Sequence, residues 1–195
     1  MRLTLKRRKE LDELVSSFCS ENKLDVKNDV IGSLYKIGFK VYSARFKREL
    51  AGMILVDENV NKLEKFDSNK IILYNEKFNY YEVRFILLHE LAHYISRKFV
   101  EKDAKLLFAV RDHNEEYHED VEEQEMDYMA ASMLVPTSEL QLKIEEYVSK
   151  NDFSNVNIVS TLQNDEYFIQ MLQREYKVEK ILARRRIGEV LEGQE

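Results

Sequence analysis

Residues 79–98 of the chain read NYYEVRFILLHELAHYISRK, and this stretch decides the interpretation of the rest. Apolar residues lie on most sides of the helix that the pattern predicts, instead of forming one stripe along it. A helix that is hydrophobic nearly all round belongs in the interior of a domain. We therefore predict a buried helix at the centre of the fold.

Two histidines and a glutamate interrupt this apolar pattern. His89 and His93 are four residues apart, so they lie one turn apart on the same face of a helix. Both imidazoles can then reach one zinc ion at about 2.0–2.1 Å. Glu90 would lie beside the metal, where it can take a proton from water and return it to a leaving amine. This His-Glu-x-x-His spacing predicts a zinc peptidase.

The residues after His93 limit the class of zinc site. A catalytic zinc site usually has three protein ligands and leaves one position for water. A metzincin would need a glycine three residues and a histidine six residues after His93, where this chain has Ser96 and Phe99. The metzincin class is therefore excluded. The alternative is that these residues bind no metal and that the two histidines and the glutamate lie partly exposed on the surface. The apolar surroundings argue against this alternative, because burial of such groups without a partner is costly.

The acidic segment 119–127 offers candidates for the third ligand. Glu123 and Asp127 are one turn apart on one face of a predicted helix. Glu123 can bind the metal, while Asp127 can accept the second N–H of a ligand histidine and so determine its tautomer. Other candidates for the third ligand are Glu119, Glu122, His113 and His118. Two alternatives stay open. One is a structural metal site, with a fourth ligand from His113 or His118, and the other is a solvated run of charges without a metal.

The rest of the chain predicts an α+β fold, with a small three-stranded sheet packed on the buried helix. Helices are expected over residues 5–20 and 27–37, and strands over 40–44, 51–57 and 70–74. Residues 99–120 are expected to hold a short helix and then a polar loop. Later helices are expected over 121–135, 137–150, 158–175 and 178–187. Thr137 or Ser138 would cap the second of these helices, and Gly188 would end the last.

The length and composition of the chain fit one globular domain. Its 195 residues are 44% hydrophobic and 34% charged, which is typical of a soluble protein with a substantial core. We expect a single domain over residues 1–195. It would consist of N-terminal helices (1–38), the sheet with the metal-site helices (39–136) and a helical C-terminal subdomain (137–195).

Net charge and cysteine content exclude several kinds of function. A formal net charge of -6 does not favour binding to nucleic acid. The single cysteine, Cys19, excludes both a disulfide framework and a cysteine-based zinc site. No apolar run approaches the roughly 20 residues needed to cross a bilayer, and no apolar segment follows the basic N-terminus as in a signal peptide. We expect a cytoplasmic protein without membrane contact.

Three stretches of the sequence resemble the ImmA/IrrE family of metallopeptidases. Residues 84–94, RFILLHELAHY, look like its Arg-Phe-x-x-x-His-Glu-x-x-His helix. Residues 123–136, EQEMDYMAASMLVP, look like its Glu-x-x-Ala-Asn-x-Phe-Ala-Ala-x-Leu-Leu-Met-Pro segment, and Ala51-Gly52 resembles a small-residue-glycine step before its sheet. A weaker likeness covers residues 176–187. The resemblance, which is gluzincin-like, implies Glu123 as the third ligand, with Asp127 in place of the family's asparagine.

The resemblance also implies a function, a cofactor and a partner. It implies the minimal metallopeptidase fold with one zinc ion per chain. Members of the family cleave, or are needed to remove, helix-turn-helix repressors in mobile elements or stress responses. The expected partner is therefore a protein substrate of this kind, with no direct contact to nucleic acid. The alternative is an anti-repressor that binds and displaces the repressor without cleaving it; the presence of Glu90 favours the enzyme.

Several further residues are candidates for the substrate cleft. In family terms the strand over residues 70–74 would lie nearest the cleft, so that a substrate segment could pair with its edge beside Tyr74. Tyr94 could stabilise an oxyanion, although packing in the core is the favoured role. His118 could line the opening of the cleft. We interpret the basic run 184–186 as a solvated helix end, with DNA contact as the less favoured alternative.

Overall fold

A computed structural model describes residues 3–46, 50–57, 63, 66–96, 107–112, 121–151, 153 and 157–192, with the backbone alone for 107–112. The elements form an α+β fold, which confirms the predicted class. In chain order they are α1 (Leu5–Glu21), α2 (Val30–Lys36), β1 (Lys40–Ala44), β2 (Leu50–Val56), β3 (Lys70–Asn75), α3 (Tyr80–Ser96), β4 (Leu107–Asp112), α4 (Val121–Leu134), α5 (Thr137–Lys150), α6 (Ile158–Asn164), α7 (Glu166–Tyr176) and α8 (Lys180–Leu191).

The described strands form one sheet in the order β1-β3-β2-β4. β1 is parallel to β3, whereas β2 is antiparallel to both β3 and β4. The three predicted strands are confirmed, but the prediction missed β4 and expected a short helix and a loop in that region. β4 forms by pairing with β2, which is distant in sequence, and the short apolar run 107–110 does not by itself distinguish a strand from a helix.

The position of β3 corrects a second expectation. β3 lies between β1 and β2 and is paired along both of its edges. An extended peptide can add only to an edge whose backbone groups are available for pairing. The prediction that a substrate pairs with the edge of the strand over residues 70–74 is therefore wrong.

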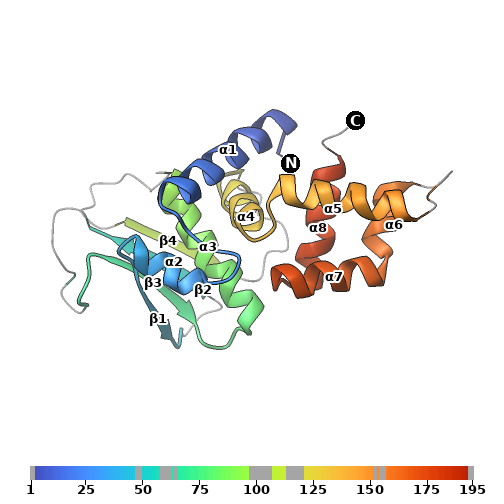
Figure 1. Cartoon of the computed structure of the whole chain (residues 1–195). Helices are drawn as coiled ribbons and strands as arrows, with labels where there is room; N and C mark the ends of the chain where they lie inside the picture. Colours follow the sequence, from blue (N-terminus) through green and yellow to red (C-terminus); the bar gives the residue numbers. More distant parts are fainter. Residues whose placement is uncertain are drawn as a thin grey trace.

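The helix α3 occupies the centre of the molecule, as predicted (Figure 1). It packs across β2 and β3 on one side and against α4 on the other, while α1 covers both helices. Burial of a large aliphatic side chain stabilises a fold by about 1.5–3 kcal/mol, so α3 is a major contributor to the core. Its fully or nearly fully buried apolar residues are Ile86, Leu87, Leu88, Leu91 and Ala92.

The C-terminal helices differ from the prediction at two points. The single helix expected over residues 158–175 is interrupted at Asp165, whose carboxylate accepts hydrogen bonds from the N–H groups of Tyr167 and Phe168 and so caps α7. Gly188 does not end the last helix, because α8 continues to Leu191. Gly188 instead packs against Gln163, and an added Cβ would lie 2.6 Å from its Nε2.

The structure also differs from the prediction at the start of α5 and in the arginine run 184–186. Neither Thr137 nor Ser138 caps α5, which follows Pro136 without a side-chain cap; the Thr137 hydroxyl instead donates to Asp12. The run 184–186 is not a solvated helix end, because Arg186 is fully buried and donates to the Val135 carbonyl. These are contacts between distant parts of the chain, which local sequence does not reveal.

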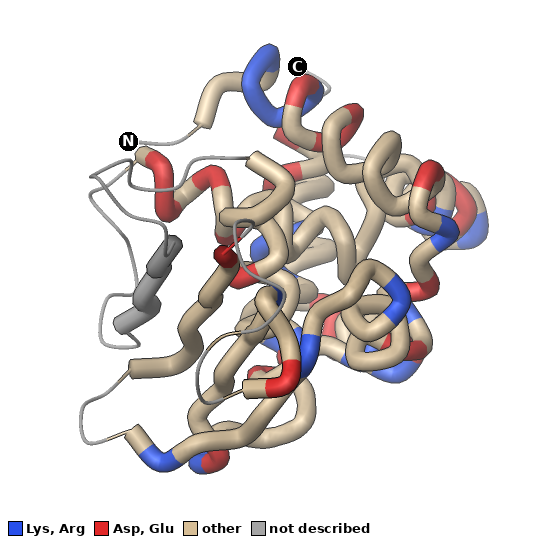
Figure 2. Tube along the Cα trace, turned by 90° about the vertical axis from the view of Figure 1, so that its left-hand side faces the viewer, with Lys and Arg blue, Asp and Glu red and all other residues tan. Residues whose placement is uncertain are grey.

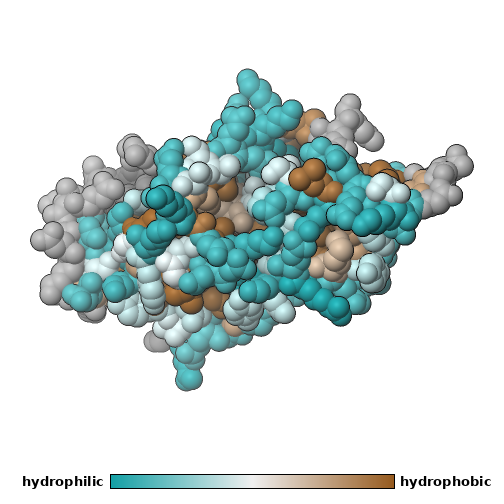
Figure 3. Space-filling view, viewed as in Figure 1, coloured by the Kyte–Doolittle hydropathy of each residue, from teal (hydrophilic) through white to brown (hydrophobic). Residues whose placement is uncertain are grey.

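The surface carries charges of both signs. Acidic and basic residues are intermixed along the helices (Figure 2), and hydrophobic residues reach the surface in small areas between hydrophilic ones (Figure 3). Within the described part of the chain, every helix is too short or too polar to span a bilayer.

Candidate metal centre

Two packed helices supply the candidate metal site. α3 contributes His89, Glu90 and His93, and α4 contributes Glu123 and Asp127. Glu123 lies in the first turn of α4, where the N–H groups and the helix macrodipole favour a negative charge. The packing of α3 on α4 thus brings together residues that are more than thirty positions apart in sequence.

The distances between the three candidate ligands are close to those of a tetrahedral metal site. His89 Nε2 lies 3.3 Å from His93 Nε2 and 3.1 Å from Glu123 Oε2, and His93 Nε2 lies 3.6 Å from Glu123 Oε1. Tetrahedral bonds of about 2.0–2.2 Å to nitrogen and oxygen would separate neighbouring ligand atoms by about 3.3–3.6 Å. One ligand atom from each residue lies within 4.8 Å of the others. The His89–His93 and His93–Glu123 distances fall in this tetrahedral range and the His89–Glu123 distance is slightly shorter, so a small shift of the Glu123 carboxylate would let one metal ion bind.

The hydrogen bond of His89 to Asp127 explains why a cation suits the site. Asp127 Oδ1 lies 2.8 Å from His89 Nδ1, and a carboxylate there accepts a hydrogen bond from the Nδ1–H group. The tautomer so stabilised leaves a lone pair on His89 Nε2, which faces the Glu123 carboxylate at 3.1 Å. In this tautomer both atoms can coordinate a cation, and the outer carboxylate would raise the basicity of the histidine.

Burial differs between the two sides of the site. His89 is fully buried and His93 is 6% exposed, whereas the side chains of Glu123 and Asp127 are 23% and 16% exposed. The histidines are therefore held in the core, while the two carboxylates of α4 lie nearer to solvent.

Glu90 is fully buried on the face of α3 that meets β2. It lies against Gly52 of β2, where an added Cβ would lie 2.8 Å from Glu90 Oε1 and 2.6 Å from Ile86 Cγ2. A residue without a side chain lets the β2 backbone approach the helix this closely. The Ala51-Gly52 step thus has a physical reason: it makes room for the carboxylate of Glu90.

Comparison with known proteins agrees with this geometry. The chain matches the family model of the IrrE N-terminal-like domain, a peptidase family, over residues 45–187. The chain belongs to this family. The matched span covers His89, Glu90, His93, Glu123 and Asp127, and it extends into α8. A search of curated proteins gave no match.

The acidic residues beside Glu123 on α4 lie in different surroundings. Glu122, the neighbour of Glu123, is exposed to solvent. Glu125 is buried and forms a two-pronged ion pair with Arg7 of α1, with distances of 2.6 and 2.9 Å. The remaining candidates, Glu119, His113 and His118, lie outside the described residues.

The two tyrosines predicted near the cleft are partly buried and both pack against the core. The Tyr94 hydroxyl accepts a hydrogen bond from Lys70 Nζ at 2.8 Å, and its ring lies edge-on to Phe39. These contacts favour the packing role of Tyr94 over oxyanion stabilisation. Tyr74 lies in β3 opposite Gly52 and packs, half-buried, against the hydrophobic core.

Sequence reasoning missed one residue at the site, Arg185 of α8. Its Nη1 lies 3.7 Å from Asp127 Oδ2, so a third helix reaches the metal site. The run of three arginines gives no signal as to which of them points inward, because consecutive helical residues face directions roughly 100° apart.

Proposed function

We propose that this protein is a zinc-dependent endopeptidase that cuts a protein substrate. The observation that carries the proposal is the convergence of His89, His93 and Glu123, together with the buried carboxylate of Glu90, which follows His89 in α3. Two imidazoles and one carboxylate are a typical ligand set of catalytic zinc, which leaves the fourth position for water or substrate. Membership of a peptidase family supports the same reaction.

Each residue of the site has a distinct role in the proposed reaction. His89, His93 and Glu123 would hold the zinc ion, and Asp127 would orient His89. When bound, zinc polarises the scissile carbonyl and lowers the pKa of a water molecule toward about 7. Glu90 would take a proton from the attacking water and pass it to the amine that leaves when the peptide C–N bond breaks. One proton is thus moved and the general base is regenerated.

We further propose that the substrate is a helix-turn-helix transcriptional repressor, cut in regulated proteolysis of a mobile element or stress response. This step rests on the family resemblance and not on a feature of the site. An extended substrate segment would pair with β4, which forms the edge of the described sheet beside β2.

The proposal is tested with the repressor encoded nearest to this chain in its genome. We expect incubation of the two purified proteins to produce one new N-terminus, identified by mass spectrometry. Removal of the metal with 1,10-phenanthroline should stop the cleavage, and added zinc should restore it. An intact repressor that loses its operator DNA in the presence of the protein would instead show displacement without cleavage.

Gly52→Ala is expected to slow the proposed cleavage while leaving the metal in place. The new Cβ would overlap Ile86 and Glu90, so either β2 or the carboxylate must move. A displacement of about 1 Å at a catalytic group can lower the rate by on the order of a hundredfold. Cleavage rate and zinc content of the purified variant measure the two effects separately.

Gly188→Ala is the matched control for this substitution. Its Cβ would also overlap a neighbour, but that neighbour is the amide at the end of the flexible Gln163 side chain, which can turn away. We expect cleavage at close to the wild-type rate. An equal rate for Gly52→Ala and wild type would show that the approach of β2 to Glu90 has no catalytic role.

A further inference from the structure

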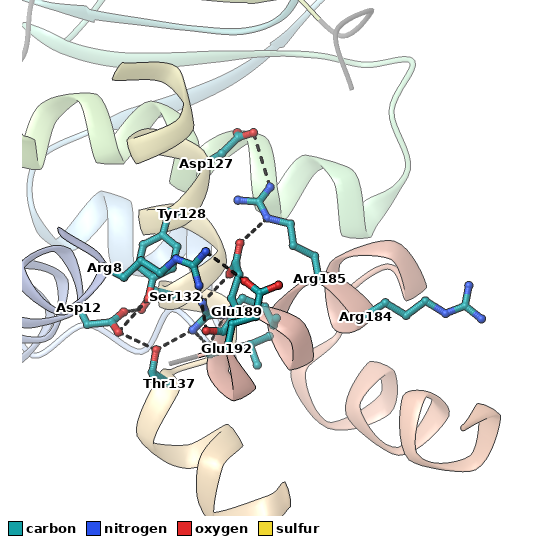
Figure 4. Close-up of polar contacts among 12 residues, drawn as sticks. Arg8, Asp12, Asp127, Tyr128, Ser132, Thr137, Arg184, Arg185, Glu189 and Glu192 are labelled. Atoms are coloured by element: carbon teal, nitrogen blue, oxygen red, sulfur yellow. Dashed lines mark hydrogen bonds and ion pairs between the residues drawn. The ribbon is translucent and has the colours of Figure 1, made fainter. Parts of the chain in front are cut away.

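We infer that Arg185 is a positioning residue for the metal site, acting through Asp127 on His89. The inference rests on the proposed metal site and extends it to α8, the last helix described. Arg185 would not touch the metal or the substrate in this role. Figure 4 shows Asp127 on α4, with Arg185 reaching toward it from α8.

The two oxygens of Asp127 face partners on two different helices. Oδ1 lies 2.8 Å from His89 Nδ1 on α3, and Oδ2 lies 3.7 Å from Arg185 Nη1 on α8. The second distance is too long for a hydrogen bond, so the attraction is that of an ion pair. Because the two partners lie at opposite oxygens, together they restrict rotation of the carboxylate. The carboxylate plane in turn determines how well Asp127 meets the Nδ1–H group of His89.

Arg185 is itself held by a carboxylate anchored in the core. Its Nε donates to Glu189 Oε1 at 2.7 Å, and Glu189 Oε2 accepts from Arg186 Nη1 at 2.7 Å. Arg186 is fully buried and donates to the Val135 carbonyl and to the Thr137 hydroxyl. This chain of contacts joins the metal site to the junction of α4 and α5. The guanidinium of Arg185 therefore has a defined position from which to act.

The charge state of Glu189 keeps this arrangement in place at neutral pH. Burial favours the neutral acid, but the attraction of Arg185 and Arg186 outweighs it and holds the pKa of Glu189 below its ordinary value. The anion also offsets the positive charge of Arg185, which would otherwise repel a divalent cation nearby. We therefore expect the effect of Arg185 on orientation to outweigh its repulsion of the metal.

The first test is the zinc affinity of Arg185→Met, measured by competition with a chromophoric chelator. Loss of an outer partner of a metal ligand typically weakens binding by about 10–100-fold, and Arg185 acts one contact further away. The expected loss is therefore smaller, and we expect the variant to bind zinc about three- to tenfold more weakly than the wild type. Arg185→Lys, which keeps the charge, should recover most of the affinity.

Arg184→Met is the matched control on the same helix. Arg184 donates to Glu166 at 2.9 Å and to the Gln163 carbonyl at 3.0 Å, and it points away from Asp127 (Figure 4). We expect its zinc affinity to equal that of the wild type. A loss of affinity as large as that of Arg185→Met would show a general weakening of α8 and overturn the inference.

A double-mutant cycle separates positioning from a merely structural role. Asp127→Asn keeps an acceptor for His89 but removes the charge that Arg185 attracts, so Arg185→Met should have no further effect on zinc affinity in that background. The visible absorption of the cobalt(II) form should shift in Arg185→Met and not in Arg184→Met. The same loss in both backgrounds, or unchanged affinity in Arg185→Met, would refute the role of Arg185. Absence of metal binding in the wild-type protein would refute the metal site itself.

Discussion

Glu90→Gln is expected to stop cleavage of the substrate while the protein still binds its metal. Glutamine has nearly the same shape as glutamate, so the packing against Gly52 and Ile86 should be preserved. An amide cannot accept the proton of the attacking water. Loss of a general base typically lowers the rate by about 10²–10⁴-fold. Cleavage is measured by the appearance of product, and metal content by elemental analysis of the same preparation.

Glu122→Gln is the control for this experiment. Glu122 is an exposed glutamate one residue before the proposed ligand Glu123, and its substitution should leave both rate and metal content unchanged.

A second measurement of Glu90→Gln is the level of repression in cells that express the variant. A Glu90→Gln protein that still relieves repression, with the repressor intact, would favour displacement over proteolysis.

His93→Ala is expected to remove the metal. A zinc site held by three protein ligands loses most of its affinity when one imidazole is deleted, so the zinc content should fall from about one equivalent to near zero. A ligand that binds only the folded state at a hundred times its dissociation constant stabilises it by about 2.7 kcal/mol. Zinc should therefore raise the melting temperature of the wild-type protein and have no such effect on His93→Ala.

Tyr94→Phe is the neighbouring control for the metal experiment. Tyr94 follows His93 in α3, but its hydroxyl bonds to Lys70 on another side of the helix. The variant should keep its zinc, with at most a small loss of stability. Full retention of zinc by His93→Ala would instead point to ligands outside the described residues, such as His113 or His118.

Features that depend on spacing within one helix could be predicted from the sequence. The helical period places His89 and His93 on one face, and likewise Glu123 and Asp127. The near-continuous apolar character of residues 79–98 predicted a buried helix, and α3 is buried. The family resemblance added that the two helices meet at one site, because the spacing within each helix says nothing about its contact with the other.

Features that depend on contacts between distant residues could not be predicted in this way. β4 exists through its pairing with β2, which lies more than fifty residues earlier in the chain. The three arginines of α8 look equivalent in sequence. In the structure Arg186 is fully buried, Arg185 reaches Asp127 and Arg184 turns to Glu166.

The sequence by itself therefore singled out His89 and His93 as candidate ligands and Glu90 as the candidate general base, because side-chain chemistry and helical period are local properties. It left the third ligand open among several residues, and the family resemblance favoured Glu123. Only the tertiary structure decided that His89, His93 and Glu123 meet within 4.8 Å, that Gly52 brings β2 against Glu90, and that α8 reaches the site through Arg185. Distances between elements depend on how the whole core packs, because close-packed side chains leave few alternative positions.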